Sequence, residues 1–168
     1  MARLTSAAIR SFFLNGSLLL AAFAAGCATY SGAGLVPGVA TEAEVEKVMG
    51  PSADRRQVHG ETVRFYPRLP AGREIYAARF GADGKLIAIE QRLTRENMEK
   101  LVRRQTTTEE VRDLFGPPYR KLDFPRLATQ VWQYPMSDVA TRQILNVEFS
   151  ADGRIKDVLL TEDLVDAN

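Results

Sequence analysis

The stretch TEAEVEKVMGP at residues 41–51 decides the fold, because the chain repeats it as TTEEVRDLFGP at residues 107–117. Four shorter matches flank it in the same order: LV 35–36 with 101–102, VRFYP 63–67 with VWQYP 131–135, REI 73–75 with RQI 142–144, and FGADG 80–84 with FSADG 149–153. The offset between copies grows slowly along the chain, which indicates small loop insertions between fixed elements. The sequence therefore predicts two copies of one unit, over residues 35–93 and 94–165.

Each repeated stretch has the signals of a short helix. Thr41 and Thr107 are each followed three residues later by a glutamate, which is the capping box that satisfies free amide hydrogens at a helix start. Apolar residues recur at the spacing of one helix face. Gly50 and Gly116, each followed by proline, are typical of a helix end. We expect one such helix at the front of each unit.

Strands follow the helix in both units. The apolar and aromatic runs predict strands at 63–67, 73–80 and 85–91, at 130–135, 142–149 and 154–160, and shorter leading strands near 55–59 and 119–122. The fold class expected is α+β: two tandem helix-then-antiparallel-meander units, with helices packed on one face of each sheet.

The Ala-Asp-Gly segment of each unit predicts a three-residue hairpin, with its glycine in the left-handed region. This choice pairs Phe80 with Leu86 and Phe149 with Ile155. It also places Glu148 opposite Lys156, whereas a two-residue turn would oppose it to Asp157, which is a like charge.

Alternation along the strands sorts their residues into two faces. The expected core face carries Tyr76, Ala78, Phe80, Leu86, Leu145, Val147, Phe149 and Ile155. The opposite face of the first unit would carry Ile75, Ala77, Ile87 and Ile89, which is too apolar for a face in water. Either the two units pack there, or a partner does.

Residues 1–26 read as a secretory leader: Arg3 and Arg10, a short apolar stretch, and small residues before Cys27. The apolar stretch is too short to span a bilayer. The ending Ala24-Ala25-Gly26-Cys27 resembles the bacterial lipobox, with Ala24 where leucine is usual, so Cys27 is expected to be lipidated. Residues 27–34 would then form the lipidated N-terminus and a linker. The alternative is an ordinary secretory cut that leaves Cys27 as a free thiol.

Charge and composition narrow the function further. The chain has 22 basic and 21 acidic residues, a balance that argues against nucleic-acid binding. Its one cysteine allows no disulfide within the chain, and its one histidine, His59, has no ligand or catalytic partner at a recognisable spacing. We expect no cofactor, no metal and no enzymatic activity.

The motif Thr-x-x-Glu-Val ending in apolar-Gly, the aromatic-x-Tyr strand and the Phe-x-x-Asp-Gly hairpin resemble the SmpA/OmlA (BamE-like) small outer-membrane lipoproteins. Gly116-Pro117-Pro118 keeps the family's Gly-x-Pro ending, whereas Gly50-Pro51-Ser52 lacks its final proline. Two such units in tandem resemble the fold of the β-lactamase inhibitor protein.

The resemblance implies a lipoprotein on the periplasmic face of the outer membrane, consistent with Ala28 after the cysteine. It would act as a protein-interaction module for the β-barrel assembly machinery or for envelope integrity.

The partner-binding residues predicted are aromatic and aliphatic: Trp132, Tyr134, Tyr66, Ile75, Ile87 and Ile89. Buried, the aromatic residues would be ordinary core; exposed, they would form an interface strip. Arg120 and Lys121 belong to a basic cluster that is either a solvated surface or a contact for lipid phosphates or an acidic partner.

Two other functions stay open. One is inhibition of a periplasmic hydrolase through a loop such as Asp123-Phe124-Pro125. The other is transport of a small apolar ligand held between the units.

Overall fold

The computed structural model describes residues 31–69, 72–137 and 141–163, which form two four-stranded antiparallel sheets and their helices. The first unit contains α1 (Glu42–Met49), β1 (Asp54–Val58), β2 (Glu61–Pro67), β3 (Ile75–Phe80) and β4 (Leu86–Gln91). The second contains α2 (Arg95–Met98), α3 (Thr108–Phe115), β5 (Arg120–Phe124), the 3-10 helix η1 (Pro125–Leu127), β6 (Thr129–Ser137), β7 (Arg142–Phe149) and β8 (Ile155–Glu162). Strand order follows chain order in both sheets, so each is a meander. The α+β fold of two repeated units is confirmed.

Helices α1 and α3 begin with the same hydrogen bonds. The backbone N–H of Thr41 donates to Glu44 Oε2 at 2.8 Å, and that of Glu44 donates to Thr41 Oγ1 at 3.3 Å. Thr107 and Glu110 repeat this arrangement at 2.7 and 3.3 Å. Backbone and hydroxyl donors favour the ionised carboxylates, and so lower the pKa of both glutamates. The capping box predicted for each unit is therefore present, and it weakens as pH falls through these lowered pKa values.

The expected three-residue hairpins are also present. Gly84 and Gly153 have φ of +73° and +75°, a region where glycine is favoured because it lacks a Cβ. Phe80 pairs with Leu86, and Phe149 pairs with Ile155, as expected.

One prediction for the second hairpin was wrong, namely the residue that pairs with Glu148. A β-bulge leaves Lys156 without an opposing residue, so Glu148 lies opposite Asp157. The like charges are tolerated because each carboxylate has its own cation. Lys156 Nζ donates to Glu148 Oε1 at 2.7 Å, and Arg103 pairs with Asp157.

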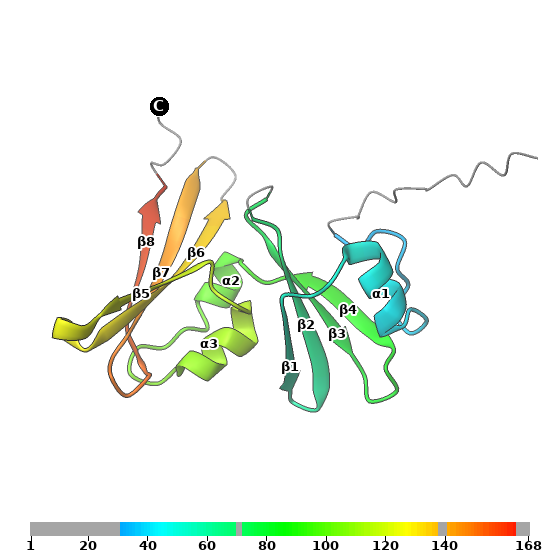
Figure 1. The fold of residues 1–168 in the computed structure, drawn as a ribbon, viewed down its shortest axis with the longest axis horizontal. Coiled ribbons are helices and arrows are strands. Elements are labelled where there is room, and N and C mark those ends of the chain that lie inside the picture. Colours follow the sequence, from blue (N-terminus) through cyan, green and yellow to red (C-terminus); the bar gives the residue numbers. More distant parts are fainter. Residues whose placement is uncertain (1–30, 70–71, 138–140, 164–168) are drawn as a thin grey trace, which may run out of the picture.

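The elements stack in four layers: α1, the first sheet, the helices α2 and α3, and the second sheet (Figure 1). One hydrophobic cluster lies between α1 and the first sheet, and consists of Ala40, Val45, Met49, Tyr66, Ala78, Phe80 and Leu86. A larger cluster joins the units, because it combines Val63, Phe65, Ile75 and Ala77 of the first sheet with α3 and the second sheet. The apolar opposite face of the first sheet is therefore covered by the second unit.

The bulge in the first hairpin also corrects the expected faces. Ile87 is its unpaired residue, and beyond it the alternation shifts by one, so Ile89 pairs with Ala78. Ile89 accordingly packs on the α1 side, while Ile87 is 39% exposed. Of the residues expected to face the second unit, only Ile75 and Ala77 belong to the shared cluster.

The contact between the units centres on Phe65, which is fully buried. A Cβ added to Gly116, at the end of α3, would lie 2.5 Å from the Phe65 ring. Polar contacts surround this centre, and they link β1 to α3. Arg56 pairs with Glu109 at 2.6 Å and with Asp113, and Arg112 Nε pairs with Asp54 Oδ2 at 2.9 Å.

The second sheet does not repeat this apolar outer face. At the repeat offsets of 68 and 69, Gln133 replaces Phe65 and Asn146 replaces Ala77. Gln133 Nε2 donates to Asn146 Oδ1 at 2.8 Å, and Asn146 Nδ2 donates to Thr161 Oγ1 at 3.0 Å. Polar side chains thus replace the apolar centre of this face, although Leu159, which pairs with Asn146, is 51% exposed on it.

Two glycines test the contact between the units. Gly50 and Gly116 have φ of +82° and +81°, but a Cβ on Gly50 would meet nothing within 4 Å. Replacing either by alanine carries a backbone penalty of ~1–3 kcal/mol. We expect Gly116→Ala to cost a further ~1–3 kcal/mol in the free energy of unfolding, because its methyl group meets Phe65. Urea denaturation measures both variants, and equal losses would contradict the close contact.

Candidate functional site

Most of the predicted partner-binding residues are in the interior. Trp132, Tyr134, Tyr66 and Ile75 are each at most 3% exposed, so they cannot form a binding surface in this structure. Ile89 is half-buried, and only Ile87 is exposed. Cys27 lies outside the described residues.

The aromatic residues of β6 are buried because the sheet's inner face needs large side chains. Trp132 packs edge-on against Phe149, with ring centroids 4.9 Å apart, and Lys121 Nζ lies 4.4 Å from the centroid of the Trp132 ring. The hydroxyl of Tyr134 donates to the carbonyl oxygen of Gly116 at 3.2 Å, and burial raises its pKa. The aromatic strip is therefore core, which was the simpler of the two interpretations.

Exposed apolar side chains gather instead on the hairpin of β5 and β6. Tyr119, Phe124 and Leu127 are 60%, 43% and 69% exposed. Arg120, Lys121 and Arg126 lie on the same segment and are exposed, as is Asp123, its only acidic residue. We call residues 119–128 the β5–β6 arm. It combines large apolar side chains with a positive charge, and its turn lies at the far end of the second unit from α1 (Figure 1).

The arm is also where the two units differ in length. β1 matches β5 at an offset of 66 residues, but β2 matches β6 at 68. His59-Gly60 joins the strands in the first unit, whereas residues 125–128 join them in the second. The insertion forms η1 and leaves Ala128 at φ +48° and ψ +44°, a left-handed conformation that costs alanine ~1–2 kcal/mol. The change of offset was the sequence signal that could have located this feature.

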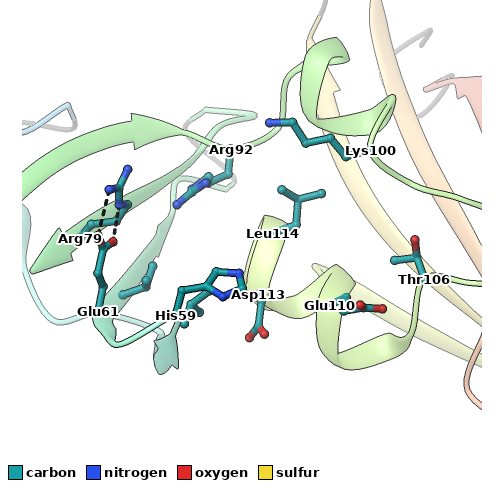
Figure 2. Close-up of a pocket in the computed structure, with 11 residues that line it drawn as sticks. His59, Glu61, Arg79, Arg92, Lys100, Thr106, Glu110, Asp113 and Leu114 are labelled. Carbon is teal, nitrogen blue, oxygen red and sulfur yellow. Dashed lines mark hydrogen bonds and ion pairs between the residues drawn. The ribbon is translucent and has the colours of Figure 1, made fainter.

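A second candidate is a cleft of ≈ 550 Å³ between the units (Figure 2). The first sheet and its β1–β2 turn supply one wall, and the segment from α2 to α3 supplies the other. Its lining residues are Val58, His59, Glu61, Val63, Arg79, Arg92, Lys100, Thr106, Glu110, Asp113 and Leu114. We call it the inter-unit cleft. Its volume is that of a typical small-molecule site.

His59 is exposed in the β1–β2 turn with φ +49°, and it lines this cleft. Within the described ranges, no group of three or more His, Cys, Asp or Glu side chains is arranged to hold a metal ion. Over the same ranges, no helix is long and apolar enough to cross a membrane.

Comparison with known proteins does not assign a family to this chain. The chain matches no family model and no curated protein. Among solved structures it is similar to a DUF4309 family protein (YjgB) from Bacillus subtilis subsp. subtilis str. 168. The identity is 21%, the match covers 78% of this chain and 84% of that chain, and the TM-score is 0.31. A similarity at this level assigns neither fold nor function.

The strained residue of the arm gives a stability test. Ala128→Gly removes the left-handed penalty at the cost of a more flexible unfolded chain, so we expect a net gain of up to ~1 kcal/mol. Ala82→Gly is the matched control, because Ala82 is an exposed hairpin residue outside the left-handed region. It should lose ~0.4–1 kcal/mol. Equal effects of the two changes on the urea midpoint would contradict the strain at Ala128.

Proposed function

We propose that this protein is a non-catalytic lipoprotein of the bacterial outer membrane, held at the periplasmic face by acyl chains on Cys27. Its two units act as an interaction module for envelope proteins, and the β-barrel assembly machinery is the first partner to test. The observation that carries the proposal is the β5–β6 arm, which exposes Tyr119, Phe124 and Leu127 while the aromatic residues predicted to bind a partner, Trp132, Tyr134 and Tyr66, are buried.

The N-terminal sequence supports the anchor. A basic start, a short apolar stretch and Ala-Ala-Gly-Cys are typical of a leader whose cysteine is lipidated. Each buried methylene of an acyl chain contributes about 0.8 kcal/mol, so several chains retain a protein stably on a membrane. The linker is shorter than the expected residues 27–34, because Gly32 is buried and its carbonyl oxygen accepts a hydrogen bond from the N–H of Leu35 at 3.1 Å. The residues between Cys27 and Gly32 would tether the folded units.

The chemistry of the arm supports a protein partner with an acidic docking surface. Phe124 and Leu127 offer apolar area at the turn, and Arg120, Lys121 and Arg126 outnumber Asp123. Gln130 Nε2 donates to Asp123 Oδ1 at 2.6 Å, so the one carboxylate of the arm has a partner, and the three exposed cations leave the arm with a net positive charge. Tyrosine and arginine are enriched among the residues that contribute most of the binding energy in protein interfaces, and the arm exposes Tyr119, Arg120 and Arg126.

Inhibition of a hydrolase is the second candidate function, because Asp123-Phe124-Pro125, the loop considered for this role, lies at an exposed hairpin turn. An arm of this kind can enter an active-site cleft, and inhibition assays against periplasmic hydrolases would test it. The apolar-ligand carrier has less support, because the shared core fills the centre of the contact between the units.

The anchor is tested by Cys27→Ser. We expect the wild-type protein to incorporate labelled fatty acid and to fractionate with the outer membrane. The variant should lose the label and enter the soluble periplasmic fraction, because the hydroxyl is not a substrate for lipidation. A variant that stays in the membrane fraction, or a wild-type thiol found unmodified by mass spectrometry, would contradict the anchor.

The docking role is tested with a photo-crosslinking amino acid at position 127 in the native host. Val39 provides the control position, because it is 64% exposed like Leu127 but belongs to the first unit. We expect position 127 to yield a defined adduct with an envelope protein, and position 39 to yield much less. Adducts with lipid alone, or equal yields at both positions, would count against the arm as the docking surface.

A further inference from the structure

The outer face of the first sheet changes character from its centre to its edge. Its centre is apolar and is buried against the second unit. Toward β4 and toward the β1–β2 turn, the same face ends in charged side chains, Glu61, Arg79, Glu90 and Arg92. Three of these four, Glu61, Arg79 and Arg92, line the inter-unit cleft (Figure 2). The cleft therefore opens where the contact between the units passes from apolar to charged residues.

The two arginines of this edge differ in how many hydrogen bonds they make. Arg79 Nε and Nη2 donate to the two oxygens of Glu61 at 2.7 and 3.2 Å, and Nη1 donates to Glu90 Oε1 at 2.6 Å. Within residues 31–69, 72–137 and 141–163, Arg92 has one ion-pair contact, from Nη2 to Glu90 Oε2 at 3.3 Å. Its Nε is buried and has no hydrogen-bond partner in this part of the chain. A guanidinium has five N–H donors, so most of those on Arg92 have no acceptor among the described residues.

Arg92 is also poorly solvated, since its side chain is only 17% exposed. Burial lowers its pKa, and the neighbouring charge of Arg79 acts in the same direction, against the attraction of Glu90 and Glu61. A guanidinium remains charged in proteins, so this position holds a cation with less hydrogen bonding than its burial requires.

The carboxylates of the cleft are, in contrast, already engaged. Glu61 is held by Arg79, Asp113 by Arg56, and Glu110 by the backbone and hydroxyl of Thr107. Lys100 is 53% exposed and adds a second cation on the opposite wall, where its Nζ contacts Asn97 Oδ1 at 2.7 Å and Glu96 at 3.5 Å. The charged groups of the cleft that can still form hydrogen bonds to a ligand are therefore the cations Arg92 and Lys100.

Apolar side chains lie close to these cations. Leu114 projects into the cleft from α3, between Lys100 and Asp113 in the view of Figure 2, and Val58 and Val63 line the wall of the first sheet. A ligand site of this size usually combines such apolar surface with a few polar groups that fix orientation.

We propose that the inter-unit cleft binds a small organic carboxylate. The carboxylate pairs with the Nη groups of Arg92 and with Lys100, and its short apolar chain lies on Leu114 and Val58, which are only partly buried. A planar guanidinium suits a carboxylate because two parallel N–H donors can meet its two oxygens. This site is separate from the β5–β6 arm, and it does not depend on what the arm binds.

The test titrates the intact folded protein with two pairs of probes and follows backbone amide shifts by NMR. Octanoate with octanamide represents an acyl chain, and N-acetyl-leucine with N-acetyl-leucinamide represents a peptide C-terminus. We expect the acid of at least one pair to shift the amides of Arg92, Lys100 and Leu114 saturably, at least about tenfold more tightly than its neutral amide. The pair that binds more tightly identifies the source of the carboxylate.

Variants assign the binding to the named cations. Arg92→Gln should weaken the preferred acid at least about tenfold, and Lys100→Gln should weaken it less, because Lys100 is more exposed. Arg55→Gln is the control, since Arg55 is an exposed arginine of β1 that does not line the cleft. Should Arg92→Gln fail to fold, Lys100→Gln decides alone. No saturable shifts, equal affinity for acid and amide, or binding unchanged in the cleft variants would overturn the proposal.

Discussion

The contact of Phe65 with the end of α3 is the constraint on which the structure depends. The outer face of the first sheet is too apolar to face water, and α3 covers it only because Gly116 lets the ring approach its backbone. The second unit therefore completes the core of the first, and the two are one folding unit. Where the same positions recur in the second sheet, Gln133 and Asn146 put hydrogen-bonded polar side chains in place of Phe65 and Ala77, so the apolar centre is not repeated.

Two features follow from the duplication and the later divergence of the copies. One is the inter-unit cleft, which exists only because the charged edge of the first sheet faces the segment between α2 and α3. The other is the β5–β6 arm, where two extra residues convert a tight turn into an exposed apolar and basic projection. Divergence between the copies has thus changed the edges and turns, while the caps and hairpins that set the fold remain alike.

Much of the fold could be predicted from the sequence because its signals are local. The threonine caps, the glycine helix ends and the three-residue hairpins each depend on a few neighbouring residues, and all are present. The sequence could not show the bulge at Ile87, which depends on backbone pairing and moves Ile89 to the other face. Nor could it show which aromatic residues are buried: Trp132 and Tyr134 would have the same alternation on an exposed sheet. The unused donors of Arg92 depend on contacts between distant residues, so the candidate site had no local signal.

The most direct test of the joined core uses the protein's single tryptophan. Trp132 is in the second unit, so its fluorescence reports on that unit when a residue of the first is changed. Phe65→Ala should destabilise the protein by ~3–5 kcal/mol. If the two units share one core, urea unfolding of this variant followed at Trp132 shifts to lower midpoint together with the far-UV circular dichroism. A Trp132 midpoint that stays at the wild-type value, while the circular dichroism alone shifts, would contradict the account.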